Sequence, residues 1–160
     1  MVAVKGEPTQ TLVQRLCAGD EKEGYAALKE LLERSRTGRE VSLYWEELAA
    51  LLGSANSYRR TRGALLLLQN ARWAEEEQLE RWTPRLLALL QEEERATALR
   101  QYLRAWEGAA RDVPALAGPL CRVLEGLDFG RYGESMAPLL QRDRERLLSA
   151  LQREGDERDG

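Results

Sequence analysis

The chain has no histidine and only two cysteines, Cys17 and Cys121, among its 160 residues. Without histidine it cannot form Ser–His–Asp or Cys–His nucleophilic sites, nor the zinc and iron centres that depend on imidazole ligands. Two cysteines are too few for a four-cysteine zinc or iron–sulfur site. A glycine-rich phosphate loop that ends in Gly-Lys-Ser or Gly-Lys-Thr is also missing. We therefore expect no catalytic residue, no metal site and no cofactor, and we interpret the protein as non-enzymatic.

Long hydrophobic runs are absent as well. The apolar stretches are short, as in residues 64–68, whereas a membrane span needs about 18 consecutive apolar residues. Residues 1–8 lack the basic start and the apolar stretch of a signal peptide. Two widely separated cysteines fit a reduced compartment better than a disulfide scaffold. We expect a cytoplasmic protein that does not enter a membrane.

Lysine is scarce relative to arginine. Only three of the 24 basic residues are lysine, and 27 acidic residues give the chain a net charge of −3. Arginine can pair with a carboxylate or phosphate through two parallel hydrogen bonds, which lysine cannot do. The net negative charge argues against general nucleic-acid binding, because domains that bind nucleic acids are usually basic overall. We expect the partner to be another protein.

Apolar residues recur at helical spacing nearly throughout the chain. Asp20 is a good helix N-cap, and Glu23 follows three residues later as in a capping box. The helix that Asp20 begins should turn Tyr25 inward, and a helix over residues 41–52 should turn Leu43 inward. No segment shows the sustained alternation of a half-buried strand. We predict an all-α protein, with further helices near residues 12–16, 65–68, 75–91, 94–110, 113–124 and 135–152.

Two stretches of the chain match each other at an offset of 38 residues. The offset aligns Arg62 with Arg100, and it also aligns these apolar pairs: Leu51 and Leu89, Leu52 and Leu90, Leu65 and Leu103, Leu68 and Trp106, Ala71 and Ala109. Two-helix units of roughly 40 residues are typical of HEAT and armadillo solenoids. We predict an α-α superhelix of helical hairpins (an α-solenoid). It would form a single repeat domain over residues 1–153, followed by a flexible polar tail over residues 154–160.

The chain resembles the HEAT-repeat superfamily at Pro84, in the first helix of a pair, and at Arg100, in the second helix. HEAT units often have a proline that bends the first helix, since an interior proline removes a backbone hydrogen bond. They often also have an inward arginine on the second helix. The resemblance implies that Arg62 and Arg100 are inter-repeat struts, meaning side chains that join neighbouring repeats. The first unit has no proline that matches Pro84, and Asn56 occupies the place of a turn aspartate typical of HEAT units.

A closer resemblance is carried by residues 56–63 (NSYRRTRG), 70–73 (NARW) and 132–140 (YGESMAPLL). These segments resemble a family of small bacterial HEAT-like proteins that is sometimes labelled SufBD-like, and the resemblance covers residues 20–151. It implies a HEAT-like fold in a bacterial protein. The label refers to an iron–sulfur assembly scaffold, so an accessory role in iron–sulfur cluster assembly is one function that the resemblance implies.

A candidate binding surface follows from the helical spacing. One helical stripe contains Tyr58, Arg62, Leu65 and Gln69. In a solenoid, the second helices of successive hairpins line the concave surface. Arginine together with aromatic residues is the mixture that is enriched at protein-interface hot spots. We predict a partner-binding groove that contains Tyr58, Arg59, Arg104 and Glu107.

Three functions are compatible with these patterns, and the first is the one we favour. It is a non-enzymatic protein-binding scaffold or adaptor that binds through the groove of second helices. The second is a nucleic-acid-binding or DNA-repair-like HEAT domain. HEAT-like DNA glycosylases use an aspartate beside aromatic residues, and Asp112 near Trp106 is the analogue this chain offers. The third is an accessory role in iron–sulfur cluster assembly.

Overall fold

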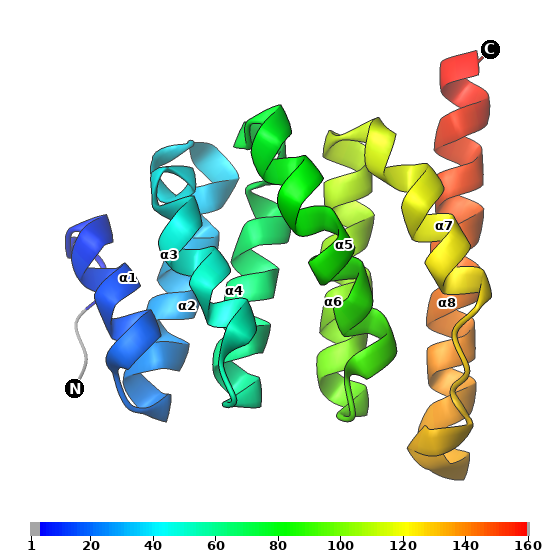
Figure 1. The fold of residues 1–160 in the computed structure, drawn as a ribbon, viewed down its shortest axis with the longest axis horizontal. Coiled ribbons are helices and arrows are strands. Elements are labelled where there is room, and N and C mark those ends of the chain that lie inside the picture. Colours follow the sequence, from blue (N-terminus) through cyan, green and yellow to red (C-terminus); the bar gives the residue numbers. More distant parts are fainter. Residues whose placement is uncertain (1–3, 160) are drawn as a thin grey trace. The chain divides into compact units, whose positions relative to one another are not determined.

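The computed structural model describes the backbone of residues 4–159 and the side chains of residues 4–156. Helices joined by short connections make up this part of the chain, and it contains no strand (Figure 1). The predicted all-α class is confirmed. None of the helices between residues 4 and 159 has the length and apolar character that crossing a bilayer requires. The chain divides into two compact units, Met1–Leu79 (unit 1) and Glu80–Gly160 (unit 2).

Unit 1 begins with two helices that pack against each other, α1 (Thr9–Ala18) and α2 (Glu21–Thr37). Asp20 caps α2 as predicted, because its Oδ1 accepts a hydrogen bond from the backbone N–H of Glu23 over 2.8 Å. The later part of unit 1 contains α3 (Trp45–Ala50) and α4 (Ser57–Gln69), together with three 3₁₀ segments, η1 (Glu40–Tyr44), η2 (Leu51–Gly53) and η3 (Ala71–Trp73).

Two apolar side chains that the periodicity directed inward are exposed instead. Leu43 is 69% exposed and Tyr25 is 59% exposed. The prediction for Leu43 is wrong because residues 41–52 do not form one helix: 3₁₀ turns, which repeat every three residues, flank the short α3. Val41 and Trp45 take the buried positions of this segment. Tyr25 lies on the outer face of α2, where the ammonium of Lys29 is 5.5 Å from its ring centroid.

The core of unit 1 is made mainly of leucine. Its most deeply buried leucines come from all four α-helices and from η2: Leu12, Leu16, Leu31, Leu48, Leu52, Leu66, Leu67 and Leu68. Burying one such side chain contributes about 2 kcal/mol. The indole of Trp45 is also in this core, at 1% exposure. The leucine-rich helical pattern of the sequence therefore supplies the packing that holds unit 1 together.

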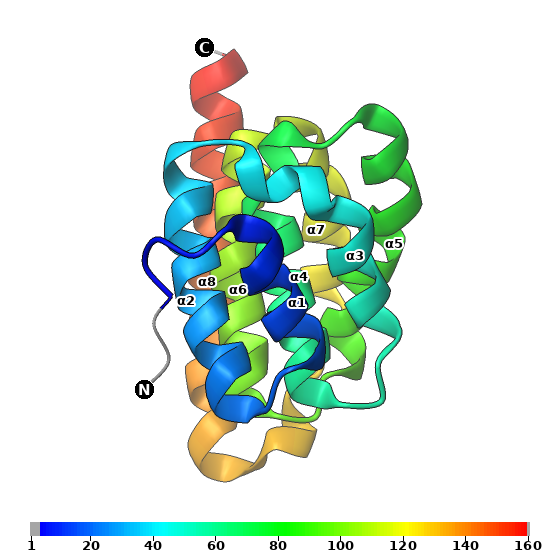
Figure 2. The same ribbon diagram turned by 90° about the vertical axis from the view of Figure 1, so that its left-hand side faces the viewer.

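Unit 2 contains most of α5 (Glu76–Glu92) and then α6 (Ala96–Asp112), α7 (Ala117–Glu125) and α8 (Gly133–Asp159), with η4 (Pro114–Leu116) and η5 (Gly130–Tyr132) between them. The helix α6 packs along α8, and both run in the same direction (Figures 1 and 2). Pro84 lies inside α5, the position that the resemblance to HEAT units leads us to expect. The helix α8 extends to Asp159, so the segment that the sequence suggests is a polar tail is helical as far as that residue.

The apolar positions that match at the offset of 38 residues are buried in both copies. Exposure is 8% or less at each of these positions: Leu51, Leu52, Leu65, Leu68, Ala71, Leu89, Leu90, Leu103, Trp106 and Ala109. The match is therefore one of burial as well as of residue type, although Leu51, Leu52 and Ala71 lie in 3₁₀ segments and their matches lie in α-helices. The same offset aligns Arg62 of α4 with Arg100 of α6, so the surroundings of these two residues can be compared.

Candidate functional site

In unit 1, Arg62 of α4 reaches across to α2. Its Nη2 donates a hydrogen bond to Oε2 of Glu21 over 2.7 Å and another to the Glu21 carbonyl oxygen over 3.3 Å. The Arg62 side chain is 6% exposed, whereas that of Glu21 is 56% exposed. A Cβ placed on Gly24 would lie 2.4 Å from Nη1 of Arg62. The missing side chain of Gly24 therefore makes the space in which the guanidinium lies.

Gln69, the last residue of the predicted α4 stripe, also bonds α2. Gln69 donates from Nε2 to the carbonyl oxygen of Leu32 over 3.0 Å, and Leu65 is buried. Tyr58, at the start of α4, is 51% exposed. Of the stripe that sequence analysis identified, only this first turn of α4 offers a large exposed surface.

Arg59, which the sequence places in the groove, lies against the end of α1. Its Nη2 donates to the carbonyl oxygen of Gly19 over 3.5 Å, and the side chain is half-buried. Cys17 is close enough that Arg59 lowers the pKa of its thiol, while burial and the carboxylate of Glu47 raise that pKa and dominate. Arg59 therefore satisfies a backbone carbonyl group at the C-terminal end of α1, and its side chain is not freely solvated in a groove.

In unit 2, Arg100 of α6 forms an ion pair with Asp143 of α8. Arg100 donates from Nε to Oδ2 over 2.7 Å and from Nη2 to Oδ1 over 3.5 Å. The hydrogen bond to Asp143 and its negative charge raise the pKa of the guanidinium. Arg62 and Arg100 thus occupy matching positions on α4 and α6, and each bonds a carboxylate of another helix of its own unit. Arg62 turns to the preceding helix α2, whereas Arg100 turns to the following helix α8.

Next to this ion pair, α6 and α8 form an arginine pocket, which we define by Arg104, Glu107, Gly108, Arg111 and Arg146. It is an open depression with a volume of about 190 Å³. The three arginines are exposed, and within residues 4–156 none of them forms a hydrogen bond or ion pair. A Cβ on Gly108 would lie 3.8 Å from Nη2 of Arg111, so that guanidinium folds back along α6. The pocket carries three positive charges and one negative charge.

Two of the four charged residues in this pocket, Arg104 and Glu107, belong to the groove that the sequence predicts. Arg111 follows Arg104 by seven residues on the same helix, and this spacing could have added it to the prediction. Arg146 lies on α8, far away in the sequence, and no sequence pattern connects it with α6. Tyr58 and Arg59 belong to unit 1, whereas Arg104 and Glu107 belong to unit 2, so the four residues of the predicted groove do not share one compact unit.

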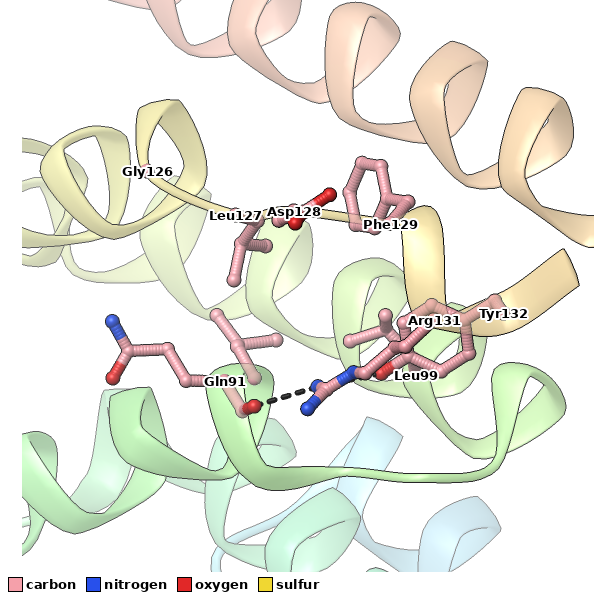
Figure 3. A pocket seen from close by; sticks show the side chains of 9 residues that line it. Gln91, Leu99, Gly126, Leu127, Asp128, Phe129, Arg131 and Tyr132 are labelled. Atoms are coloured by element: carbon pink, nitrogen blue, oxygen red, sulfur yellow. Dashed lines mark hydrogen bonds between the residues drawn. The ribbon is translucent and has the colours of Figure 1, made fainter.

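A second pocket of unit 2, of about 330 Å³, lies where η5 meets the connection between α5 and α6 (Figure 3). Arg131 extends across it and donates from Nη2 to the carbonyl oxygens of Gln91, over 2.6 Å, and Glu93, over 3.0 Å. The Tyr132 hydroxyl also donates to the Glu93 carbonyl oxygen. Burial raises the pKa of this hydroxyl. The polar side chains of this pocket therefore serve to hold the α5–α6 connection.

The thiols and carboxylates of residues 4–156 are the other groups that could carry chemistry. Cys17 and Cys121 are half-buried thiols that belong to different units, and burial raises the pKa of both. No group of three cysteine or carboxylate side chains within the described residues could hold a metal ion. Trp106 is 1% exposed, so its ring does not form an open aromatic surface beside Asp112.

Comparisons with known proteins give no further guidance, since no family model, curated protein or solved structure matches the chain. The geometry of its own side chains is therefore the basis for a functional proposal. Among the clusters described above, the arginine pocket is the one whose charged groups have no partner within residues 4–156.

Proposed function

We propose that the protein is a non-enzymatic scaffold or adaptor of HEAT-like helical hairpins in a bacterial cytoplasm, and that it binds another protein through its second helices. In unit 2 the binding surface is the arginine pocket between α6 and α8. The helices, their matching buried positions and the resemblance to HEAT units support the architecture. Pro84 and the arginines at matching positions of α4 and α6 support it as well.

The arginine pocket is the observation that carries this proposal. Guanidinium groups stay charged at all ordinary pH values, and three of them with one carboxylate leave an excess of positive charge. A folded chain commonly pairs neighbouring charges, as Arg100 is paired with Asp143 one turn away. Exposed arginines that have no partner within residues 4–156 are suited to pair with carboxylates of another molecule, and arginine is enriched at interface hot spots.

Affinity purification from the native host tests the proposal. The tagged full-length chain is compared with Arg104→Glu and with Arg142→Glu, which is exposed on the same helix as Arg146 but does not line the pocket. We expect Arg104→Glu to abolish capture of the partner and Arg142→Glu to preserve it. Both variants should keep the thermal stability of the original chain, because exposed charges contribute little to folding. Capture that survives the double variant Arg104→Glu, Arg111→Glu would rule the pocket out as the binding surface.

Arg59→Glu is a poor probe of the groove that the sequence predicts. Arg59 donates to the carbonyl oxygen of Gly19, and its charge acts on the Cys17 thiol. A glutamate there would face that carbonyl group without a hydrogen to donate, so the variant would lose folding stability. Its loss of binding would then have two explanations, whereas Arg104→Glu leaves the packing of unit 2 intact.

A further inference from the structure

We propose that the arginine pocket binds an acidic peptide segment of the partner, with one carboxylate between Arg104 and Arg146 and a second carboxylate beside Arg111. This inference rests on the proposed function, which requires only that the pocket binds a protein. It adds the chemistry of the segment and the positions of its charges.

The Arg100–Asp143 ion pair shows which residues of α6 and α8 lie at the same height. Arg104 is four residues beyond Arg100, and Arg146 is three residues beyond Asp143. Since the two helices run in the same direction (Figure 1), both arginines lie one helical turn, about 5 Å, beyond the ion pair. Both line the pocket. The residue of α8 at the height of Arg100 is therefore an aspartate, which pairs with it. One turn further on, the residue of α8 at the height of Arg104 is Arg146, which carries the same charge as Arg104.

The next positive charge along the pocket is Arg111. It lies seven residues beyond Arg104, which is about 10 Å along α6. Glu107 lies between the two arginines on the same helix and also lines the pocket. The sequence of charges along the pocket is therefore positive, negative, positive. The helix positions of Arg104 and Arg111 are about 10 Å apart, and the Arg111 guanidinium folds back toward Gly108. A matching ligand therefore has two negative charges within about 10 Å of each other, with a neutral or positive group between them.

A peptide matches this arrangement better than a phosphate or nucleic acid does. The pocket lies beside the middle and end of α6, where backbone N–H groups are used within the helix, so it lacks the free amides of a phosphate site at a helix N-terminus. A continuous phosphate backbone would bring negative charge against Glu107. Aspartate and glutamate side chains separated by a few residues can instead avoid Glu107 and still form bidentate pairs with arginine.

Fluorescence anisotropy with the full-length chain tests this proposal. The probe is a labelled peptide of about ten residues, mostly glycine and serine, with two glutamates three residues apart near its centre, which places their Cα atoms about 10 Å apart when the peptide is extended. We expect salt-sensitive binding, because exposed charges are screened by added salt. Arg104→Glu and Arg146→Glu should each weaken binding about tenfold, since each replaces an attraction by a repulsion. Arg142→Glu should change it less than about twofold.

Three control probes decide the chemistry: the same peptide with glutamine in place of glutamate, with phosphoserine in place of glutamate, and a single-stranded DNA of similar length. Tighter binding of the phosphopeptide or the DNA than of the glutamate peptide would overturn the proposal. Equal losses in Arg146→Glu and Arg142→Glu would overturn it as well. If no peptide binds while Arg104→Glu still abolishes capture of the partner, the proposal of an acidic peptide segment is wrong and the proposed scaffold function stands. Should the peptide bind while capture is independent of Arg104, the proposed function is wrong at this site.

Discussion

The guanidinium of Arg62 occupies the place where a side chain of residue 24 would lie. The three atoms nearest to a Cβ on Gly24 all belong to Arg62, at 2.4, 2.8 and 3.4 Å. Gly24 lies inside α2, where glycine destabilises a helix relative to alanine by about 1 kcal/mol. Unit 1 therefore accepts a poor helix former on α2 in exchange for a buried arginine that bonds Glu21. The two residues depend on each other although they are far apart in the sequence.

We predict that Gly24→Ala lowers the free energy of unfolding when residue 62 is arginine and raises it when residue 62 is alanine. In the original chain it should lower the free energy of unfolding by about 1 kcal/mol, because the displaced guanidinium loses its bonds to Glu21. In the Arg62→Ala background it should raise that free energy by up to about 1 kcal/mol, since the helix gains an alanine and the clash is gone. Urea unfolding of the four proteins of this cycle measures the coupling.

Arg62→Ala by itself should destabilise the protein by about 2 kcal/mol, the contribution of a charged hydrogen bond in a buried position. Glu21 is exposed, so it is hydrated when its partner is lost and adds no penalty. Additive effects of Gly24→Ala and Arg62→Ala would contradict the steric relationship between these residues.

The connection between α5 and α6 should weaken when its hydroxyl donor is removed. Tyr132→Phe leaves the aromatic ring in place but deletes the hydrogen bond to the Glu93 carbonyl oxygen, and we expect a loss of about 1 kcal/mol. Arg131 still donates to that oxygen. The double variant Tyr132→Phe, Arg131→Ala should therefore lose more than the sum of the two single losses, as measured by chemical denaturation. A Tyr132→Phe variant as stable as the original chain would show that the arginine suffices.

The start of α4 depends on Asn56. Its Oδ1 accepts hydrogen bonds from the backbone N–H groups of Tyr58, over 2.9 Å, and Arg59, over 3.2 Å. Asn56→Ala should lower the free energy of unfolding by about 1 kcal/mol, the usual effect of losing an N-cap. Asn56→Asp is the matched control: it keeps the acceptor and adds a negative charge at a helix N-terminus, so it should be at least as stable as asparagine. Thermal unfolding of both variants checks the pair.

The two thiols should react slowly and lower the stability of the fold at high pH. Burial raises the pKa of Cys17 and of Cys121, with Glu47 and Glu125 raising them further. The native thiols therefore keep their protons at a pH where the unfolded chain has lost them. Stability is complete below the pKa of the unfolded thiol and is lost as the pH rises toward the native pKa.

Iodoacetamide labelling from about pH 7 to pH 10 measures this prediction, because only the thiolate reacts. Each thiol is isolated by the variant that replaces the other one, Cys17→Ser or Cys121→Ser. The midpoint of the rate profile should lie at higher pH in the folded protein than in urea. The same midpoint in both states would contradict the raised pKa of that thiol.

Much of the local structure follows directly from the sequence. Asp20 begins α2 as predicted, and the apolar residues that match at the offset of 38 are buried in both copies. Caps and helical stripes depend on residues within a few positions of one another, so a sequence pattern contains all that is needed. The prediction fails at Leu43, where 3₁₀ turns change the period. The period of a short segment is set by its neighbours in space, which the sequence does not identify.

The sequence by itself determined that the chain is helical, which apolar positions match, and that Arg62 and Arg100 match at the same offset. Only the tertiary structure decided what each arginine bonds. Arg62 bonds Glu21 and Arg100 bonds Asp143, whereas the Arg104 side chain forms no hydrogen bond or ion pair within residues 4–156 and lines a pocket together with Arg146. The physical reason is that helical periodicity specifies which face of a helix is buried, whereas the partner of a charged side chain depends on how two helices far apart in sequence are aligned. A shift of α8 by one turn would place a different residue opposite Arg104.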